Sequence, residues 1–183
     1  LDAAGHAVVA HMLPEADPIQ KVSIISRGRT GGFTMKTPTE DKSYHTLNEF
    51  KSDLAVMLAG QIAEREVFNE ISTGASSDLK QATGLARQIV TRYGMSKLGP
   101  RTFGAQEEMI FLGREIHEQR DYSEKVAQDI DQEINHLLTE AQTTATKIIS
   151  KQRESLDRVA GELLVKETIE RDVFEKLLGP KPT

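Results

Sequence analysis

The 183-residue sequence contains no cysteine and no tryptophan, and only 5% of its residues are aromatic. Because it has no thiolate, the chain cannot form disulfides, and any metal site must use His, Asp or Glu as ligands. A core with so few rings has to be filled mainly by Leu, Ile, Val, Ala and Met. The length suits one domain with a real core, or two small helical lobes.

Long apolar runs and basic clusters are also missing. No stretch approaches the roughly 20 apolar residues that a membrane-spanning helix needs, and no signal-peptide pattern is present. The formal net charge of −5 and the lack of a Lys/Arg cluster argue against a nucleic-acid partner. There is no Gly-x-x-x-x-Gly-Lys-Ser/Thr loop for a nucleotide. We therefore expect a soluble piece of chain with no nucleic-acid partner and no ATP site of its own.

Helical periodicity dominates what is present. Apolar residues recur at intervals of three and four in the first residues and in most of the chain after Thr46, which forms a predicted capping box with Glu49. Two apolar stripes in the last third predict neighbouring helices that bury against each other as a hairpin or small bundle. The expected helices cover 1–13, 47–68, 78–93, a long segment capped by Ser123, a segment containing Leu156 to Leu164, and 168–178.

One short region has strand character instead. KVSIIS (Lys21–Ser26) alternates and is rich in β-branched residues, so it is expected to be a strand. The glycines that follow favour a turn, and Gly32–Met35 is the expected return strand. We therefore expect a mainly α protein with a small β-hairpin or sheet near its N-terminus.

The first helix carries a candidate metal pair. Asp2 and His6 are four residues apart, so both side chains project from one helix face and can supply two ligands to a divalent cation. With Ala3 between them, they stand where a helical H-E-x-x-H metalloprotease motif has His, Glu and His. Taken alone, His6 is more simply a hydrogen-bonded core histidine. Gly5 weakens that interpretation, because glycine costs a helix about 1 kcal/mol relative to alanine and permits another backbone to approach closely.

A second candidate lies in STGASSDL (Ser72–Leu79). Its Ser and Asp oxygens can satisfy the free N–H groups at the start of the next helix, which would make it an ordinary N-cap. Alternatively, Asp78 is a metal ligand delivered from a second helix. Composition and spacing leave both interpretations open.

A third candidate is GGFT, which comprises Gly31, Gly32, Phe33 and Thr34. It is either a plain hairpin turn or the edge of a small sheet. An extended peptide can pair with such an edge by strand addition, and these four residues would then bind substrate.

The blocks AGHAVVAHMLP, DPIQKVSIISRG, LAGQIAEREVF, ISTGASSDL and ATGLARQIVTRYGMS carry a resemblance that spans almost the whole chain. They resemble the peptidase domain of FtsH-type proteases, which are membrane-anchored, ATP-dependent AAA+ zinc metalloproteases. The resemblance implies a single FtsH-like peptidase domain over 1–183, with a metal-site lobe at 1–104 and a C-terminal helical bundle within 105–183.

By position, the resemblance implies zinc ligands at His6, at Asp78 and, in place of the family's first histidine, at Asp2. The family's general-base glutamate falls on Ala3. Alanine cannot take a proton from water, and general acid–base assistance is typically worth about 10²–10⁴-fold, so hydrolysis is expected to be severely impaired. Asp2 also gives zinc a harder ligand set, so a weakened or absent zinc site is expected.

The resemblance also concerns parts beyond this sequence. An AAA+ module that binds ATP and a membrane anchor are expected upstream of Leu1, because the first residues already have the character of a helix interior. The full protein is expected to form a homo-hexamer at a bacterial inner membrane, facing the cytoplasm, or at the equivalent organelle membrane. Its expected substrates are unfolded, short-lived or membrane proteins. The competing interpretation is a pseudoprotease, a non-catalytic helical scaffold for ring assembly and substrate handling. A natural, an engineered or a fragment-end origin of the altered motif stays open.

Overall fold

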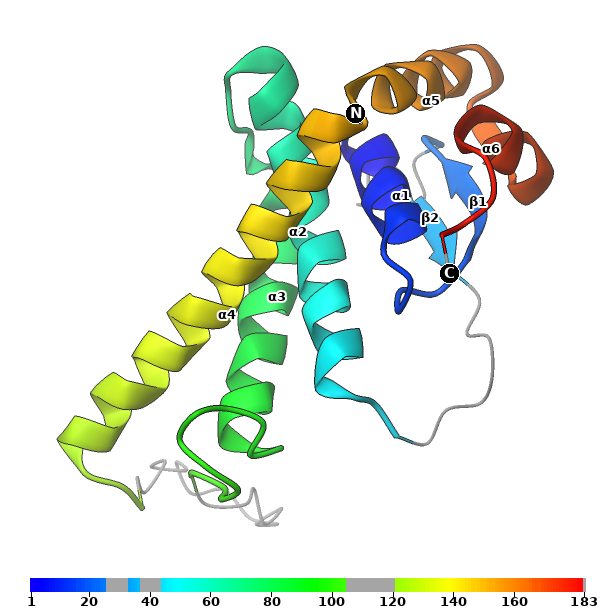
Figure 1. Cartoon of the computed structure of the whole chain (residues 1–183). Coiled ribbons are helices and arrows are strands. Elements are labelled where there is room, and N and C mark those ends of the chain that lie inside the picture. Colours follow the sequence, from blue (N-terminus) through cyan, green and yellow to red (C-terminus); the bar gives the residue numbers. More distant parts are fainter. Residues whose placement is uncertain (26–32, 37–43, 105–120, 183) are drawn as a thin grey trace, which may run out of the picture.

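The computed structural model describes residues 1–25, 33–36, 44–104 and 121–182 of the chain. Helices dominate, and a small sheet lies beside the first of them (Figure 1), which confirms the expected mainly α fold. In chain order the elements are α1 (Asp2–Met12), β1 (Ile19–Ser23), β2 (Phe33–Lys36), α2 (Leu47–Phe68), the 3₁₀ turn η1 (Thr73–Ala75), α3 (Ser76–Thr91), α4 (Glu124–Lys151), α5 (Arg153–Lys166), β3 (Thr168–Glu170) and α6 (Arg171–Leu178).

Side-chain caps set where two of the helices begin, as the sequence predicts. Glu49 N donates to Thr46 Oγ1 (3.2 Å) and Thr46 N donates to Glu49 Oε2 (2.7 Å), which completes the capping box of α2. Ser123 Oγ accepts a hydrogen bond from Val126 N at 3.3 Å at the start of α4. Each cap satisfies N–H groups that have no intrahelical partner and stabilises its helix by about 1 kcal/mol.

Helices α2, α3 and α4 form a bundle (Figure 1). The helices do form a bundle, but the apolar stripe of α4 is buried mainly against α2 and α3, so the prediction that it packs against the stripe of α5 is wrong. Helix α5 packs on α1 and α6 instead, and it diverges from α4 after Gln152 rather than lying along it as a hairpin. A stripe predicts which face of a helix is buried, but any apolar surface can cover it. The buried stripe of α4 consists of Ile130, Ile134, Leu137, Ala141, Ala145 and Ile149.

The sheet has three antiparallel strands in the order β2–β1–β3. The predicted hairpin is confirmed, although its first strand occupies Ile19–Ser23 rather than Lys21–Ser26. Its return strand is Phe33–Lys36 rather than Gly32–Met35. The glycines predicted to form the turn, Gly28, Gly31 and Gly32, lie outside the described residues.

The third strand corrects a prediction. Residues Thr168–Glu170, expected to open a helix, form β3, and α6 begins only after them. Ile169 of β3 lies opposite Val22 of β1, and Thr168 Oγ1 is 2.9 Å from Ser23 Oγ. A strand this short has no recognisable period of its own and is stable only because β1 offers it a hydrogen-bonding edge.

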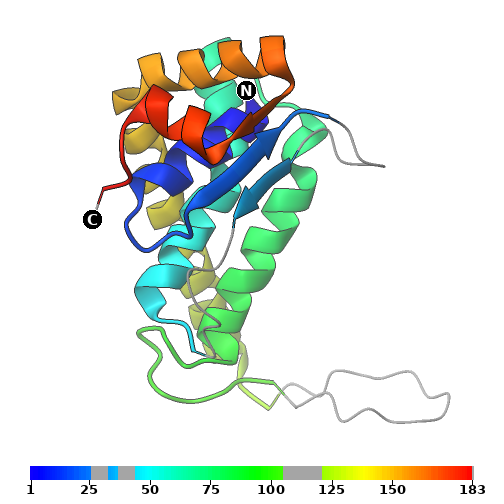
Figure 2. The same ribbon diagram turned by 90° about the vertical axis from the view of Figure 1, so that its right-hand side faces the viewer.

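Helix α1 is buried on almost every side. It lies between α2 and the sheet, and α5 also packs against it (Figure 2). A helix that is apolar nearly all round is typical of a core position. At its C-terminal end, Lys181 Nζ donates to the carbonyl oxygens of Ala10 (2.7 Å) and Leu13 (2.5 Å), so the C-terminal residues hold this helix end. The fully buried residues of α1 are Ala4, Ala7, Val8, Val9 and Ala10.

Candidate metal centre

Asp2 and His6 lie on one face of α1, as their spacing predicts. Oδ1 of Asp2 is 3.5 Å from Nε2 of His6. The Asp2 side chain is 50% exposed and that of His6 only 15%. The pair therefore sits at the edge of the core, with solvent reaching it from the side of the aspartate.

Asp78 joins this pair from the first turn of α3. Its Oδ2 lies 3.3 Å from His6 Nε2, and one ligand atom from each of Asp2, His6 and Asp78 lies within 4.8 Å of the others. The residue at the cap position of α3 is Ala75, which makes no side-chain cap. Ser72 instead caps the preceding η1 turn by accepting from Gly74 N, so this segment contains a serine cap and also brings Asp78 to His6.

The turn that precedes Asp78 is tied to α2. Ser72 Oγ donates to Glu64 Oε2 over 2.8 Å and accepts a hydrogen bond from Gly74 N over 3.2 Å. A serine hydroxyl has one proton and two lone pairs, so both bonds form together. This contact explains how α2 holds the η1 turn, and with it the start of α3, in place.

The carbonyl oxygen of Val56 in α2 orients the imidazole of His6. His6 Nδ1 is 2.6 Å from this oxygen. A carbonyl can only accept, so Nδ1 carries the proton and Nε2 faces the two aspartates. An imidazole held this way by its other nitrogen is the usual arrangement of a metal-binding histidine.

The three side chains perturb one another electrostatically. Burial lowers the pKa of His6, but the hydrogen bonds that it donates to Asp2 and Asp78 outweigh burial and raise the pKa to about 10. The hydrogen bond to His6 in turn holds the pKa of Asp2 below its usual value, against the effect of burial. The raised pKa of His6 and the lowered pKa of Asp2 both favour an ion pair between these two side chains.

Two glycines let the helices come this close. A Cβ built on Gly5 would lie 2.8 Å from Ala59 O and from Ala63 Cβ, so only glycine fits where α1 crosses α2. A Cβ built on Gly60 would overlap Asp2 Oδ1 and lie 2.7 Å from His6 Nε2. Gly60 therefore forms the floor of the cluster, and a larger residue would occupy the space in which the polar atoms meet.

Two of the ligand separations in the cluster match those expected around a divalent cation. Two ligands held about 2.1 Å from a tetrahedral ion lie about 3.4 Å apart, which is close to the 3.5 Å and 3.3 Å distances from His6 Nε2 to Asp2 and Asp78. Carboxylate oxygen and imidazole nitrogen are both suitable ligands, and an ion can replace the proton on Nε2.

Ala3 lies in the same turn of α1 and is 7% exposed. Its methyl group can neither accept nor donate a proton, so the position that the resemblance gives to the general base offers no acid–base group. Of the four residues predicted to bind a peptide strand, Phe33 and Thr34 lie in β2, at an edge of the sheet. Gly31 and Gly32 lie outside the described residues.

Sequence reasoning did not identify Val56 and Gly60 as parts of the cluster. The contribution of Val56 is a backbone carbonyl, which leaves no trace in residue type. Gly60 could have been identified from the sequence, because a glycine inside a helix often marks the close approach of another group.

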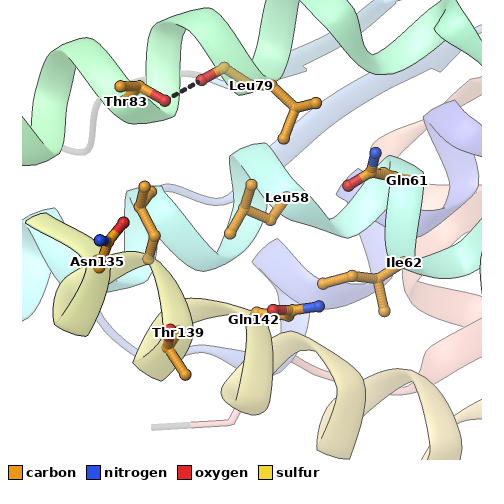
Figure 3. A pocket seen from close by; sticks show the side chains of 9 residues that line it. Leu58, Gln61, Ile62, Leu79, Thr83, Asn135, Thr139 and Gln142 are labelled. Atoms are coloured by element: carbon orange, nitrogen blue, oxygen red, sulfur yellow. Dashed lines mark hydrogen bonds between the residues drawn. The ribbon is translucent and has the colours of Figure 1, made fainter.

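A separate pocket of about 180 Å³ opens between α2, α3 and α4 (Figure 3). Its lining is uncharged, and Thr83 Oγ1 already donates to Leu79 O over 2.8 Å within α3. Ligand pockets usually start at about 300 Å³ and contain placed polar groups, so this pocket offers less chemistry than the Asp2, His6 and Asp78 cluster. The pocket is lined by Leu58, Gln61, Ile62, Leu79, Thr83, Asn135, Leu138, Thr139 and Gln142.

Residues 2–177 match the sequence profile of peptidase family M41. The chain is also similar to curated proteins of much greater length. It is 50% identical over 181 residues to "ATP-dependent zinc metalloprotease FtsH 1" of Thermomicrobium roseum, a match that covers 98% of this chain and 28% of that protein. It is 51% identical over 181 residues to the protein of the same name in Sphaerobacter thermophilus, with the same coverage. The "ATP-dependent zinc metalloprotease FtsH" of Chloroflexus aggregans is 50% identical over 179 residues, with 96% of this chain and 27% of that protein covered.

Proposed function

Because this chain belongs to peptidase family M41 and is an FtsH-type peptidase domain, we propose that it is the peptidase domain of an ATP-dependent zinc metalloprotease. We propose further that its own peptide hydrolysis is impaired. The observation that carries the proposal is the convergence of Asp2, His6 and Asp78 from two helices onto one point. In this proposal the three side chains are the metal ligands. A zinc ion bound there would polarise a water molecule and the scissile carbonyl.

Each residue of the cluster has its own proposed role. His6 is oriented through Nδ1 by Val56 O, and Nε2 is the atom that gives up its proton when a cation binds. Asp78 brings a negative charge from α3, and Asp2 brings a second from α1. No group at Ala3 can take the proton of the water or pass it to the leaving amine, and that loss alone corresponds to about 10²–10⁴-fold in rate.

Substrate would approach the cluster from the sheet. Strand β2 lies at an edge of the three-stranded sheet and has one side free of a strand partner among the described strands. An extended, unfolded segment can add to such an edge through its main chain, which suits substrates of many sequences. Phe33 and Thr34, with Gly31 and Gly32, remain the proposed substrate-binding residues.

The wider setting is also part of the proposal. The chain spans little more than a quarter of the length of the curated relatives described above, since the matches cover 27–28% of them. No helix of the described residues is long and apolar enough to cross a membrane. We propose that the AAA+ module, the membrane anchor and the contacts of a homo-hexameric ring are supplied with the rest of such a protein, and that unfolded or short-lived proteins are its substrates.

A second candidate function is a non-catalytic scaffold for ring assembly and substrate handling. It is favoured by the combination of a lost base at Ala3 with intact packing of α1 on α2 through Gly5, Ala59 and Ala63. The fold would then be retained for its surface rather than for its chemistry. Both functions predict the same structure, and they differ only in what a repaired site would do.

The experiment that decides between them measures bound metal and casein cleavage in two proteins. One is the unaltered chain, and the other carries Asp2→His and Ala3→Glu. The protease proposal predicts slow or no cleavage by the unaltered chain, and cleavage by the repaired chain that a chelator abolishes.

Repair of Asp2→His alone is the matched control, because it restores a ligand without restoring a base. It should bind metal but not recover the rate. If the doubly repaired chain binds no metal and cuts nothing while its circular dichroism is unchanged, the protease proposal is wrong and the scaffold function is the one that remains.

A further inference from the structure

Asp2 gives the proposed ligand set a carboxylate oxygen in place of a second imidazole nitrogen. We infer that this centre has lost much of the preference for zinc over harder divalent cations of the Mn²⁺ class that two histidines would give it. The inference rests on the proposed metal centre and specifies its ion.

The first argument is the donor set. Asp2 and Asp78 supply carboxylate oxygens, and only His6 supplies nitrogen. Imidazole favours zinc and the later transition metals, whereas carboxylate and water favour Mg²⁺, Ca²⁺ and Mn²⁺. Replacing one of two imidazoles with a carboxylate therefore removes more affinity for zinc than for a harder ion.

The second argument is the space available for water. The candidate cluster contains three ligands from the part of the chain that the structure describes. The side chains of Asp2 and Asp78 are 50% and 30% exposed, so the outer side of the cluster is open to solvent. Three protein ligands on one side and solvent on the other therefore leave room for the several waters that a harder, octahedral ion keeps.

The third argument concerns the inner side. The backbone of α2 closes it at Gly60, where even a Cβ would overlap Asp2 Oδ1 and lie 2.7 Å from His6 Nε2. No protein side chain can enter from that direction. The remaining coordination positions therefore go to water on the open side, one water for a tetrahedral zinc ion or several for a harder ion. The geometry admits both ions, so the donor set decides the preference between them.

The test compares zinc and manganese in the 183-residue chain and in its variants. Zinc affinity is measured with ZnCl₂ by competition against a chromophoric chelator. Manganese affinity is measured with MnCl₂ from the loss of the electron paramagnetic resonance signal of free Mn²⁺. The central variant is Asp2→His, and its matched control is Asp131→His, which makes the same change at an exposed position of α4.

We expect Asp2→His to raise the ratio of zinc affinity to manganese affinity by on the order of tenfold or more. Asp131→His should change neither affinity. Asp2→Asn supplies a second comparison if the histidine variant does not fold. Its amide oxygen carries no charge, so manganese affinity should fall more than zinc affinity.

Two failures are distinguishable. If Asp2→His and Asp2→Asn change both affinities by equal factors, the inferred ion preference is overturned and the metal centre stands. If neither ion binds to the unaltered chain or to Asp2→His, or if Asp78→Asn leaves binding unchanged, the proposed metal centre itself is wrong.

Discussion

His6 Nδ1 donates a hydrogen bond to the carbonyl oxygen of Val56 over 2.6 Å, and this contact fixes which ring nitrogen faces Asp2 and Asp78. The imidazole belongs to α1, but its orientation is set by the backbone of α2. The geometry of the cluster thus depends on how closely the two helices pack, and the small residues at their crossing control that distance. Changes on α2 that touch no ligand directly should therefore affect metal binding.

The first prediction concerns the floor of the cluster. Gly60→Ala places a methyl group where Asp2 and His6 meet, so we expect metal affinity to fall by about 10- to 100-fold and stability to fall by about 1–3 kcal/mol. Equilibrium dialysis and urea unfolding would measure the two effects. Gly84→Ala is the control, because a Cβ there meets nothing within 4 Å and should stabilise α3 by up to about 1 kcal/mol. Equal behaviour of the two variants would contradict the role given to Gly60.

The second prediction concerns alkaline pH in the metal-free chain. The pKa of His6 is raised from 6.5 to about 10 in the folded protein, so the folded state holds a proton that the unfolded state releases above 6.5. The stabilisation is complete below pH 6.5 and is lost as pH rises to about 10, by up to about 1.4 kcal/mol per pH unit. Urea unfolding in EDTA across this range would measure the slope. His6→Asn should remove it, while His136→Asn on α4 should not.

The third prediction concerns acidic pH and a different histidine. His11 is 3% exposed and packs edge-on against Phe174, with ring centroids 5.3 Å apart. Burial lowers its pKa, the charge of Lys181 lowers it further, and Glu175 opposes the shift. As the pH falls, His11 therefore takes up a proton in the unfolded state before it does so in the folded state. The free energy of unfolding should decrease as the pH drops below 6.5.

Replacing His11 should remove this loss of stability at acidic pH. His11→Phe keeps a ring against Phe174 without a titrating group, so its unfolding free energy should depend less on pH between 5 and 6.5 than that of the unaltered chain, as on the order of one proton is no longer taken up. His136→Gln serves as the control. An identical pH profile in the His11→Phe variant would refute the assignment.

The fourth prediction concerns the C-terminal strand. Ile169 is 1% exposed and lies opposite Val22 in the sheet that packs on α1. Ile169→Ala should destabilise the chain by about 2–5 kcal/mol, because it leaves a cavity in a closed core. Val165→Ala, at a side chain that is 80% exposed, should change the stability by less than about 0.5 kcal/mol. Similar urea midpoints for the two variants would show that β3 is not part of the core.

Two of the helix starts and the buried face of α4 follow from local sequence alone. The Thr46 and Glu49 box, the Ser123 cap and the stripe of α4 depend on residues within one or two turns of each other, so their spacing suffices to predict them. The shared face of Asp2 and His6 is of the same kind. The identity of the third ligand came from a family resemblance, not from spacing.

Only the tertiary structure decided which distant groups meet. Asp78 reaches His6 because α1 and α3 both pack on α2, and Val56 and Gly60 enter the cluster through backbone atoms and empty space. Strand β3 exists because β1 offers it an edge, although its residues were expected to be helical. Sequence periodicity records which side of an element is buried, but the partner is selected by packing over the whole chain, where contacts between remote segments outweigh weak local propensities.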